Sequence, residues 1–216
     1  MKSSTVPHVI LLLIACVVLS SCKTIGFRLI GFRTPKALEE EKILSVGNRF
    51  NIPSEDVYQL DSSYLNYITW VDSTKSEAVA KNHYQPLQAL YYNQGGELIS
   101  FHINCYAGGM MFIDWNRDDI MEVYPPKQQA PLDTLFCRDT VLAMLQPLST
   151  TNEFEAYRNE EVVVVFWTKF MTRQSRRLIR FVQNNAALAE DREVKIIYVN
   201  MDNFFMSMDA EIETED

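Results

Sequence analysis

Apolar residues in the last third of the chain follow the pattern of a strand, a helix and a second strand. Residues 162–166 read Val-Val-Val-Val-Phe, and a continuous apolar run of this length is typical of a strand covered on both faces. Residues from Thr172, a helix-capping type, to about Ala189 keep helical spacing, and residues 194–199 are again apolar. Two buried strands joined by one helix predict a parallel pair with a right-handed crossover.

A β-hairpin is predicted in the middle of the chain. Residues 87–92 and 97–103 are strand-like runs, and Asn93-Gln94-Gly95-Gly96 between them is rich in residues that accept a positive φ angle. Helical spacing follows at residues 132–145. These elements together predict an α/β fold in which helices flank a mixed sheet.

Signals for helix starts dominate the first part of the predicted domain. Thr34-Pro35 places a capping hydroxyl before a proline at the first helical position, and Gly47 is a typical helix end, which predicts a helix between them. A second start is indicated at Ser54-Glu55-Asp56, and residues 76–83 predict a short helix. Residues 63–71 are rich in aromatic and β-branched side chains and fit a strand and a helix equally well.

Residues 108–129 combine glycine, proline and acidic residues and predict a long irregular excursion. Residues 114–119 begin with the acidic alternation of a calcium-binding loop. Asp119 stands where that loop needs glycine and Pro125 where it needs a bidentate carboxylate, so we reject calcium binding. Four aromatic residues around the excursion either line a ligand cleft or, as we favour, pack beneath the loop: Tyr106, Phe112, Trp115 and Tyr124.

An apolar run at residues 6–19 follows Lys2 and ends in Leu19-Ser20-Ser21-Cys22. A charged start, an apolar stretch of this length and small residues before a cleavage point are typical of a secretory signal peptide. The last four residues resemble the lipobox of bacterial lipoproteins, which implies cleavage before Cys22 and lipidation of that cysteine. The alternative is an ordinary secretory signal in which Cys22 is incidental. We predict a signal peptide at 1–21, a lipid-anchored tether at 22–33 and a folded domain at 34–216.

The predicted anchor places the chain in the cell envelope, with a lipid membrane as its first partner. Each buried methylene of an acyl chain such as palmitate contributes roughly 0.8 kcal/mol, so two or more chains hold a protein stably. No acidic run follows Cys22, where Lys23-Thr24-Ile25-Gly26-Phe27 stands, and this favours a periplasm-facing anchor over surface export. Loss of the signal peptide would leave 19 of the 20 basic residues against 28 acidic ones, which argues against a nucleic-acid partner.

Two of the four cysteines, Cys105 and Cys137, lie in the predicted domain. An oxidising compartment permits a disulfide between them, and the alternative that we favour is two separate buried thiols. Their separation fits neither a redox pair nor a metal-binding pair, and only two histidines, His83 and His102, belong to the domain. The sequence contains neither a glycine-rich phosphate loop nor a serine-nucleophile motif. We therefore expect no metal and no cofactor.

The strand–helix–strand pattern resembles the core of thioredoxin-like domains. In that family an apolar strand ends in Phe-Trp, a turn brings a Cys-x-x-Cys pair to a helix N-terminus, and the next strand ends near Asn-x-Asp. Here Phe166-Trp167-Thr168-Lys169-Phe170 matches the first strand end and Asn200-Met201-Asp202 the second. Met171 and Gln174 stand at the two cysteine positions. Neither side chain forms a thiolate, so the resemblance implies a domain without exchange chemistry at this place.

The other part of that fold is expected upstream, because the chain ends soon after Asp202. Thioredoxin-like domains continue into a helix, a cis proline, an antiparallel hairpin and a closing helix. Here Gln85-Pro86, the predicted hairpin and residues 132–145 resemble that segment. The resemblance implies halves 34–150 and 151–216 in swapped order, or a duplicated pair of partial domains. It further implies a cis bond before Pro86 and a sheet in which the strands beginning near residues 194, 162, 87 and 97 are neighbours in that order.

Two main functions follow from the resemblance. The first is a redox-inactive binding or scaffold module for a polypeptide partner, because thioredoxin-like domains face a bound polypeptide with the motif turn and the proline. The alternative is a thiol-disulfide oxidoreductase that uses Cys105 or Cys137 in a rearranged site, and a passive spacer in an envelope complex is a third role. The partner-binding surface implied by the first function comprises Trp167, Thr168, Lys169, Met171, Gln174, Gln85 and Pro86.

Arginines at positions 173, 176, 177 and 180 form one stripe on the predicted helix that follows the motif. Such a stripe fits anionic lipid headgroups, an acidic partner or an ordinary solvated helix face, and the sequence alone favours the last.

Overall fold

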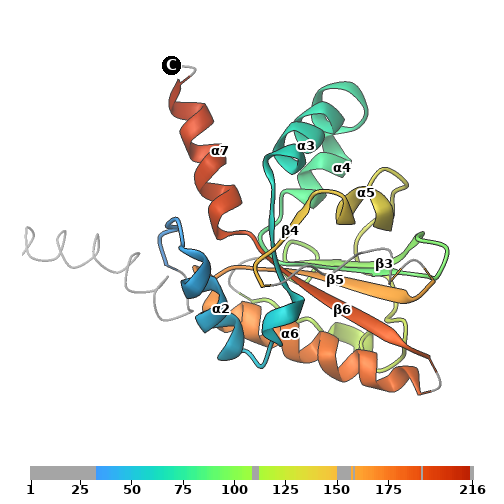
Figure 1. Ribbon diagram of the computed structural model, residues 1–216. Helices are drawn as coiled ribbons and strands as arrows, with labels where there is room; N and C mark the ends of the chain where they lie inside the picture. Colours follow the sequence, from blue (N-terminus) through green and yellow to red (C-terminus); the bar gives the residue numbers. More distant parts are fainter. Residues whose placement is uncertain (1–32, 109–111, 150–156, 158, 191, 215–216) are drawn as a thin grey trace, which may run out of the picture.

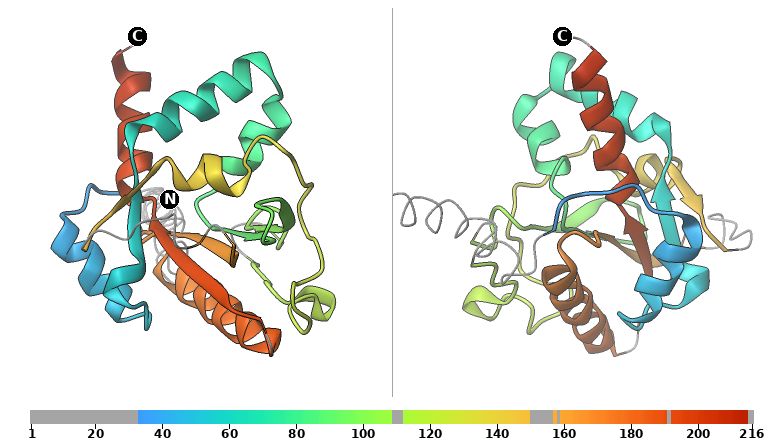
Figure 2. Two further views of the ribbon diagram at one scale, coloured as in Figure 1. Left: turned by 45° about the vertical axis from the view of Figure 1, so that its right-hand side comes forward. Right: turned by 90° about the vertical axis from the view of Figure 1, so that its left-hand side faces the viewer.

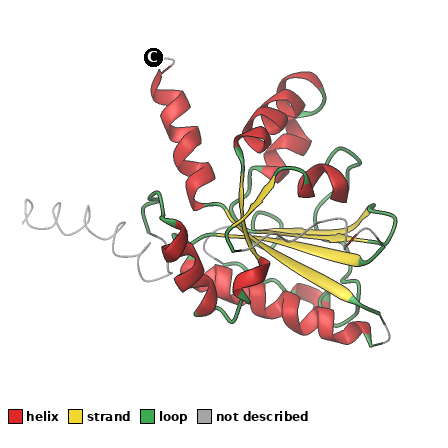
Figure 3. Ribbon diagram, in the orientation of Figure 1, coloured by secondary structure: helices red, strands yellow, loops and turns green. Residues whose placement is uncertain are grey.

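The computed structural model describes residues 33–108, 112–149, 157, 159–190 and 192–214 (Figure 1). At its centre is a six-stranded mixed sheet in the order β3-β2-β5-β6-β1-β4. β5, β6 and β1 are parallel, whereas β2 runs antiparallel to β5, β3 to β2 and β4 to β1. The predicted class, an α/β fold with helices flanking a mixed sheet, is confirmed (Figure 3). The strands are β1 Val57–Leu60, β2 Gln88–Tyr92, β3 Leu98–Ile103, β4 Leu145–Pro147, β5 Glu161–Trp167 and β6 Val194–Asn200.

The predicted strand–helix–strand unit is confirmed by β5, helix α6 (Thr172–Ala186) and β6. Every residue of β5 is buried, because the strand has a neighbour on each side and helices on both faces. β5 and β6 are paired in parallel from Glu161–Val194 to Trp167–Asn200. The unbroken apolar run is thus the central strand that its composition predicts.

Helices cover both faces of the sheet, as Figures 1 and 2 show, and a separate hydrophobic core lies on each face. Val162 and Val164 point into one core, and Val163 and Val165 into the other, as the two-residue period of a strand requires. On the face of Val163, α6 packs beside α2 (Glu40–Asn48). The helices on the face of Val162 are α3 (Ser62–Thr74), α4 (Glu77–His83), α5 (Arg138–Leu142) and α7 (Asp202–Thr214).

The predicted hairpin is confirmed as β2 and β3, with a turn at residues 93–96. The N–H of Asn93 donates to the carbonyl of Glu97 at 3.1 Å, and Gly96 has a φ angle of +80°, which glycine adopts without strain. β2 lies against β5, so the predicted order of the strands beginning near residues 194, 162, 87 and 97 is confirmed as β6, β5, β2 and β3. β1 and β4, which extend the sheet beyond β6, were not predicted.

The predicted helix at 132–145 is much shorter, since α5 covers only Arg138–Leu142. Residues from Asp133 to Phe136 instead form a local turn, in which Oδ1 of Asp133 accepts the N–H groups of Leu135 and Phe136 at 2.9 Å each. Tertiary contacts hold this turn as well, because the hydroxyls of Tyr67 and Tyr92 donate to the carbonyls of Leu135 and Phe136. α5 packs on the face opposite α6.

In the first part of the domain two predicted helix starts are wrong, those at Thr34-Pro35 and at Ser54-Glu55-Asp56, and two other predictions are confirmed. α2 begins at Glu40, not at Thr34-Pro35, although it ends near Gly47 as predicted. α4 is the expected short helix, with the hydroxyl of Ser76 accepting the N–H of Val79 at 3.3 Å. Ser54–Asp56 forms a single 3₁₀ turn, and the ambiguous stretch at 63–71 lies within helix α3.

The predicted signal peptide, Cys22 and all of the tether except Arg33 lie outside the described residues. Among the helices that the structure describes, none has the length and hydropathy needed to cross a bilayer.

Candidate functional site

Residues 167–171, called here the motif turn, connect the end of β5 to the start of α6. The carboxylate of Asp202 accepts the main-chain N–H of Lys169 at 2.6 Å and that of Phe170 at 3.3 Å. The side-chain amide of Asn200 donates to the same carboxylate at 2.8 Å. Asp202 is buried, and burial raises the pKa of its carboxyl group although these donors act in the opposite direction. The Asn-x-Asp sequence after β6 therefore holds the motif turn in place.

Hydrogen bonds within the turn fix it further. The N–H of Thr168 donates to Oγ of Ser175 at 3.2 Å, and that hydroxyl donates back to the carbonyl of Thr168 at 2.7 Å. Thr172, expected to cap α6, is its first residue, and its hydroxyl donates to the carbonyl of Lys169 at 2.5 Å. Met171 occupies the N-cap position of α6, and its side chain makes no capping hydrogen bond.

Most of the motif turn is inaccessible, contrary to the prediction of a partner-binding surface. Trp167, Thr168 and Met171 have no exposed surface, and Gln174 keeps 5%. Lys169 is half-buried. The predicted surface is therefore wrong for these four buried residues, which belong to the interior of the domain.

α2 and the residues after it provide the cover. Ile43 and Phe50 share a buried cluster with Trp167 and Met171. The ring of Phe50 meets that of Trp167 edge to face, with centroids 5.6 Å apart and planes at 75°. Because the covering residues lie more than a hundred positions earlier in the chain, the sequence around the motif gives no sign of them.

Residues 33–39, called here the strap, precede α2 and form neither helix nor strand. At one end the N–H of Arg33 donates to the carbonyl of Phe170 in the motif turn at 2.8 Å. Near the other end Asn203 binds both main-chain polar groups of Leu38. Its Oδ1 accepts the N–H at 2.8 Å, and its amide donates to the carbonyl at 3.0 Å. The side chain of Leu38 packs on the cluster beneath the turn. These contacts explain why the helix predicted from Thr34-Pro35 starts later.

The Gln85-Pro86 edge lies next to the motif turn, as predicted, because β2 begins beside the end of β5, with Gln88 opposite Phe166. Gln85 and Pro86 are half-buried. The predicted cis bond before Pro86 is wrong, since the cis peptide bond among the described residues is Tyr124–Pro125. The side-chain carbonyl of Gln85 is occupied within the domain, where it accepts the amide of Asn104 at 3.0 Å.

Cys105 and Cys137 are both free thiols, so the disulfide alternative is wrong. The expectation of two buried thiols is wrong too, because Cys105 is exposed and Cys137 is half-buried. Sγ of Cys105 donates to Oε1 of Gln85 at 2.8 Å, and Sγ of Cys137 lies 3.1 Å from Oγ1 of Thr140. The Cys105 thiol therefore lies at the Gln85-Pro86 edge, among neutral amide groups.

His83 is a fully buried titratable residue outside the motif turn. Its Nε2 lies 2.8 Å from Oδ2 of Asp133, and its ring stacks on Phe136 with centroids 3.6 Å apart. Burial lowers the pKa of His83 although Asp133 acts to raise it. Nε2 of His83 donates to the Asp133 carboxylate, because an ionised carboxylate can only accept. Its Nδ1 is buried without a hydrogen-bond partner. The pair joins the end of α4 to the loop before α5 and offers no surface to a substrate.

His102 and Ser100 form a second buried pair, with Nε2 of His102 3.0 Å from Oγ of Ser100. This distance fits a nucleophile and its base, but both residues are fully buried. Nδ1 of His102 has no hydrogen-bond partner to orient the ring, and burial lowers the pKa of His102 to about 3. We assign this pair a structural role.

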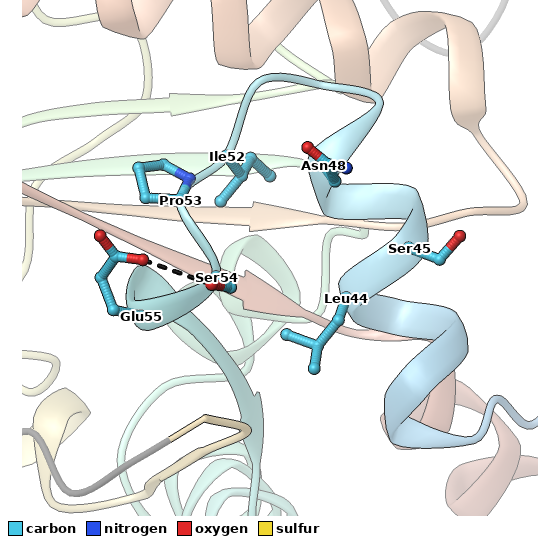
Figure 4. Close-up of a pocket in the computed structure, with 7 residues that line it drawn as sticks. All are labelled: Leu44, Ser45, Asn48, Ile52, Pro53, Ser54 and Glu55. Atoms are coloured by element: carbon cyan, nitrogen blue, oxygen red, sulfur yellow. Dashed lines mark hydrogen bonds between the residues drawn. The ribbon is translucent and has the colours of Figure 1, made fainter.

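Figure 4 shows a shallow, open pocket of about 580 Å³ between α2 and the 3₁₀ turn at Ser54–Asp56. The hydrogen bond drawn among its lining residues joins the Ser54 hydroxyl to Oε2 of Glu55 at 3.4 Å. The labelled side chains do not converge on a common point, so the pocket lacks the focused polar groups of a ligand site. Its lining is Leu44, Ser45, Asn48, Ile52, Pro53, Ser54 and Glu55.

The favoured packing of aromatic side chains beneath the excursion after β3 is confirmed for Trp115 and is wrong for Tyr106 and Phe112. Trp115 is fully buried beneath it, whereas Tyr106 and Phe112 are exposed by 46% and 78%. Arg117–Asp119 forms a 3₁₀ turn. Within the described part of the chain, no group of three or more histidine, cysteine or acidic side chains is placed to bind a metal ion.

Comparison with protein-family models gave no match, and neither did comparison with curated proteins or with solved structures.

Proposed function

We propose that this chain is an envelope lipoprotein, anchored through lipid on Cys22, whose body is a redox-inactive thioredoxin-like domain that binds an extended polypeptide at the motif turn. The arrangement of β6, β5, β2 and β3 supports the thioredoxin-like part, because it is the neighbour order expected if the two halves are swapped. Met171 and Gln174 at the cysteine positions support the absence of exchange chemistry.

The observation that carries the binding function is the strap. Thioredoxin-like domains face bound polypeptides with this turn, and here the turn carbonyl of Phe170 and the amide of Asn203 already hold a segment of chain through its main-chain groups. Hydrogen bonds to main-chain N–H and C=O groups are how proteins hold extended peptides regardless of sequence, whereas a buried side chain such as Leu38 selects among them. The strap is the resident occupant, and a partner segment competes with it.

Peptide binding in trans tests this function. The strap sequence, residues 33–39, is added as a free peptide to the mature chain and to the variant Leu38→Asp, in which a charge replaces the packed side chain of the resident strap. We expect saturable peptide binding to Leu38→Asp, measured by NMR. Binding to the wild-type chain should be much weaker, because the strap of the wild-type chain competes at a high effective concentration. Leu38→Asp combined with Asn203→Ala serves as the control and should lose binding. Equal binding to all three chains would contradict the function.

The anchor has its own test, metabolic labelling with a fatty acid. The wild-type chain should incorporate label and Cys22→Ser should not. An unlabelled wild-type chain would contradict the proposed lipid anchor and would leave the proposed polypeptide binding unaffected.

One observation favours the oxidoreductase alternative, namely that Cys105 is exposed beside the Gln85-Pro86 edge. Among the described residues its hydrogen-bond partners are the neutral amides of Gln85 and Asn104, which do not activate a thiol as a cationic group would. Reduction of a small disulfide by the mature chain, abolished in Cys105→Ser, would establish the alternative.

A further inference from the structure

The outward face of α6 carries arginines without acidic partners. The helix contains no aspartate or glutamate, although the whole chain has 28 acidic residues and 20 basic ones. Arg173 and Arg180 are exposed and form no ion pair with any described residue. Arg176 lies over the ring of Phe50 at 5.5 Å, and Arg177 donates to the carbonyl of Ile113 at 2.9 Å. Phe50 and Ile113 thus contact the two sides of the helix, and no other helix or strand covers its outer face in the described structure (Figure 1).

An exposed aromatic residue adjoins this face. Phe112 immediately precedes Ile113, whose carbonyl binds Arg177, and 78% of Phe112 is exposed. Phe112 is the most exposed of the large hydrophobic side chains among the described residues, so its ring is accessible to the apolar edge of a bilayer. Aromatic rings next to arginines are typical of protein surfaces at the headgroup level of a membrane.

The strap places the anchor at the same end of the molecule. Arg33 is bonded to Phe170, and the next residue after Phe170, Met171, precedes α6. Between Cys22 and Arg33 the chain has only residues 23–32, which span at most about 40 Å when fully extended. Whatever conformation they adopt, the N-terminal end of α6 stays within that reach of a bilayer that holds the lipid.

We propose that the outward face of α6, through Arg173 and Arg180 and with Phe112 beside it, docks on anionic lipid headgroups of the bilayer that carries the anchor. The inference rests on the proposed lipid anchor and extends it by giving the body an orientation. Guanidinium groups pair with headgroup phosphates, and each basic residue near an anionic surface strengthens binding about fivefold. The membrane is favoured over an acidic protein because the tether brings this face to lipid and because Phe112 fits an interface.

Vesicle flotation of the mature chain with Cys22→Ser, which removes the lipid, tests the surface by itself. We expect it to float with vesicles of phosphatidylglycerol and phosphatidylcholine, to stay behind with phosphatidylcholine alone, and to be released by salt. Arg173→Glu with Arg180→Glu should lower the partition coefficient at least about tenfold. The matched control, Lys75→Glu with Lys81→Glu, makes the same change in net charge on exposed residues of the opposite face and should leave partitioning nearly unchanged. Phe112→Ser should weaken binding to the same vesicles.

Several outcomes would overturn the proposal. Equal losses of vesicle binding in the two double variants would show that net charge alone causes the effect. A chain that does not bind anionic vesicles would contradict the proposal. A photoreactive residue at position 180 that captures a protein rather than lipid in cells would assign the face to an acidic partner. Failure of the anchor is recognised separately, since fatty-acid labelling of Cys22 would be missing while vesicle binding by the body persisted.

Discussion

Nε2 of His83 and Oδ2 of Asp133 lie 2.8 Å apart, with the histidine side chain fully buried and that of Asp133 8% exposed. Burial raises the pKa of Asp133, but the hydrogen bonds from His83 and from the main chain of Phe136 and Leu135 outweigh it and bring the pKa below its usual value. The pair thus connects the end of α4 to the loop before α5.

Asp133→Asn should destabilise the fold, because the neutral amide keeps the loop contacts but weakens the bond to His83. We expect the free energy of unfolding to fall by about 1–3 kcal/mol, measured by denaturant titration. Asp72→Asn, on the exposed surface of α3, is the matched control and should change it by less than about 0.5 kcal/mol. An equal change in the free energy of unfolding of both variants would contradict a stabilising role of the His83–Asp133 pair.

The stability of the fold should decrease as the pH falls from about 6.5 toward 4. Burial lowers the pKa of His83 and of His102 below the usual value of about 6.5, to about 3 for His102. The unfolded chain therefore binds protons at a higher pH than the folded chain, so the stability that the uncharged rings provide is complete above about 6.5 and is lost as the pH falls. His102 contributes a slope of roughly 1.4 kcal/mol per pH unit, and His83 adds a slope of the same sign. His102→Gln, which retains a partner for Ser100, should remove one such slope, and an unchanged pH profile would contradict the prediction.

Local apolar runs were sufficient to predict β5, α6, β6 and the β2–β3 hairpin, because the burial of each element shows in its own pattern of apolar residues and, for the hairpin, in its turn residues. Elements held by distant residues were not predictable. Thr34-Pro35 is a valid helix start by local propensity, yet Asn203 holds Leu38 in a nonhelical strap. The resemblance correctly placed Met171 and Gln174 at the start of α6, but their burial depends on α2, which no local pattern reveals.

Asn203→Ala should release the strap, since it removes both hydrogen bonds to the main chain of Leu38. The loss of two bonds, each worth about 1 kcal/mol, should increase the open population and accelerate tryptic cleavage after Lys36 roughly tenfold or more. Mass spectrometry of the fragments measures this. Asn66→Ala, on an exposed position of α3, should leave the cleavage rate unchanged. Rapid cleavage of the wild-type chain at Lys36 would show that the strap is not held.

The two thiols should differ in reactivity. Cys105 is exposed, whereas Cys137 is half-buried beside Thr140. A maleimide added to the native mature chain should label Cys105 well before Cys137, and Cys105→Ser should lose the fast phase. If the folded chain instead formed an intramolecular disulfide on mild oxidation, the separation of the two thiols would be refuted.

Restoring the cysteine pair tests both the resemblance and the cover over the motif turn. In Met171→Cys with Gln174→Cys, the two thiols would stand one helical turn apart at the start of α6, where the helix N-terminus favours a thiolate. We expect the pair to form a disulfide when it is oxidised. The reduced pair should reduce a protein disulfide slowly, because position 171 has no exposed surface. Adding Phe50→Ala, which shortens one of the covering side chains, should raise the reduction rate at least about tenfold, because access to the thiols limits the rate. Failure to form the disulfide would refute the residue correspondence, whereas fast reduction without Phe50→Ala would refute the cover.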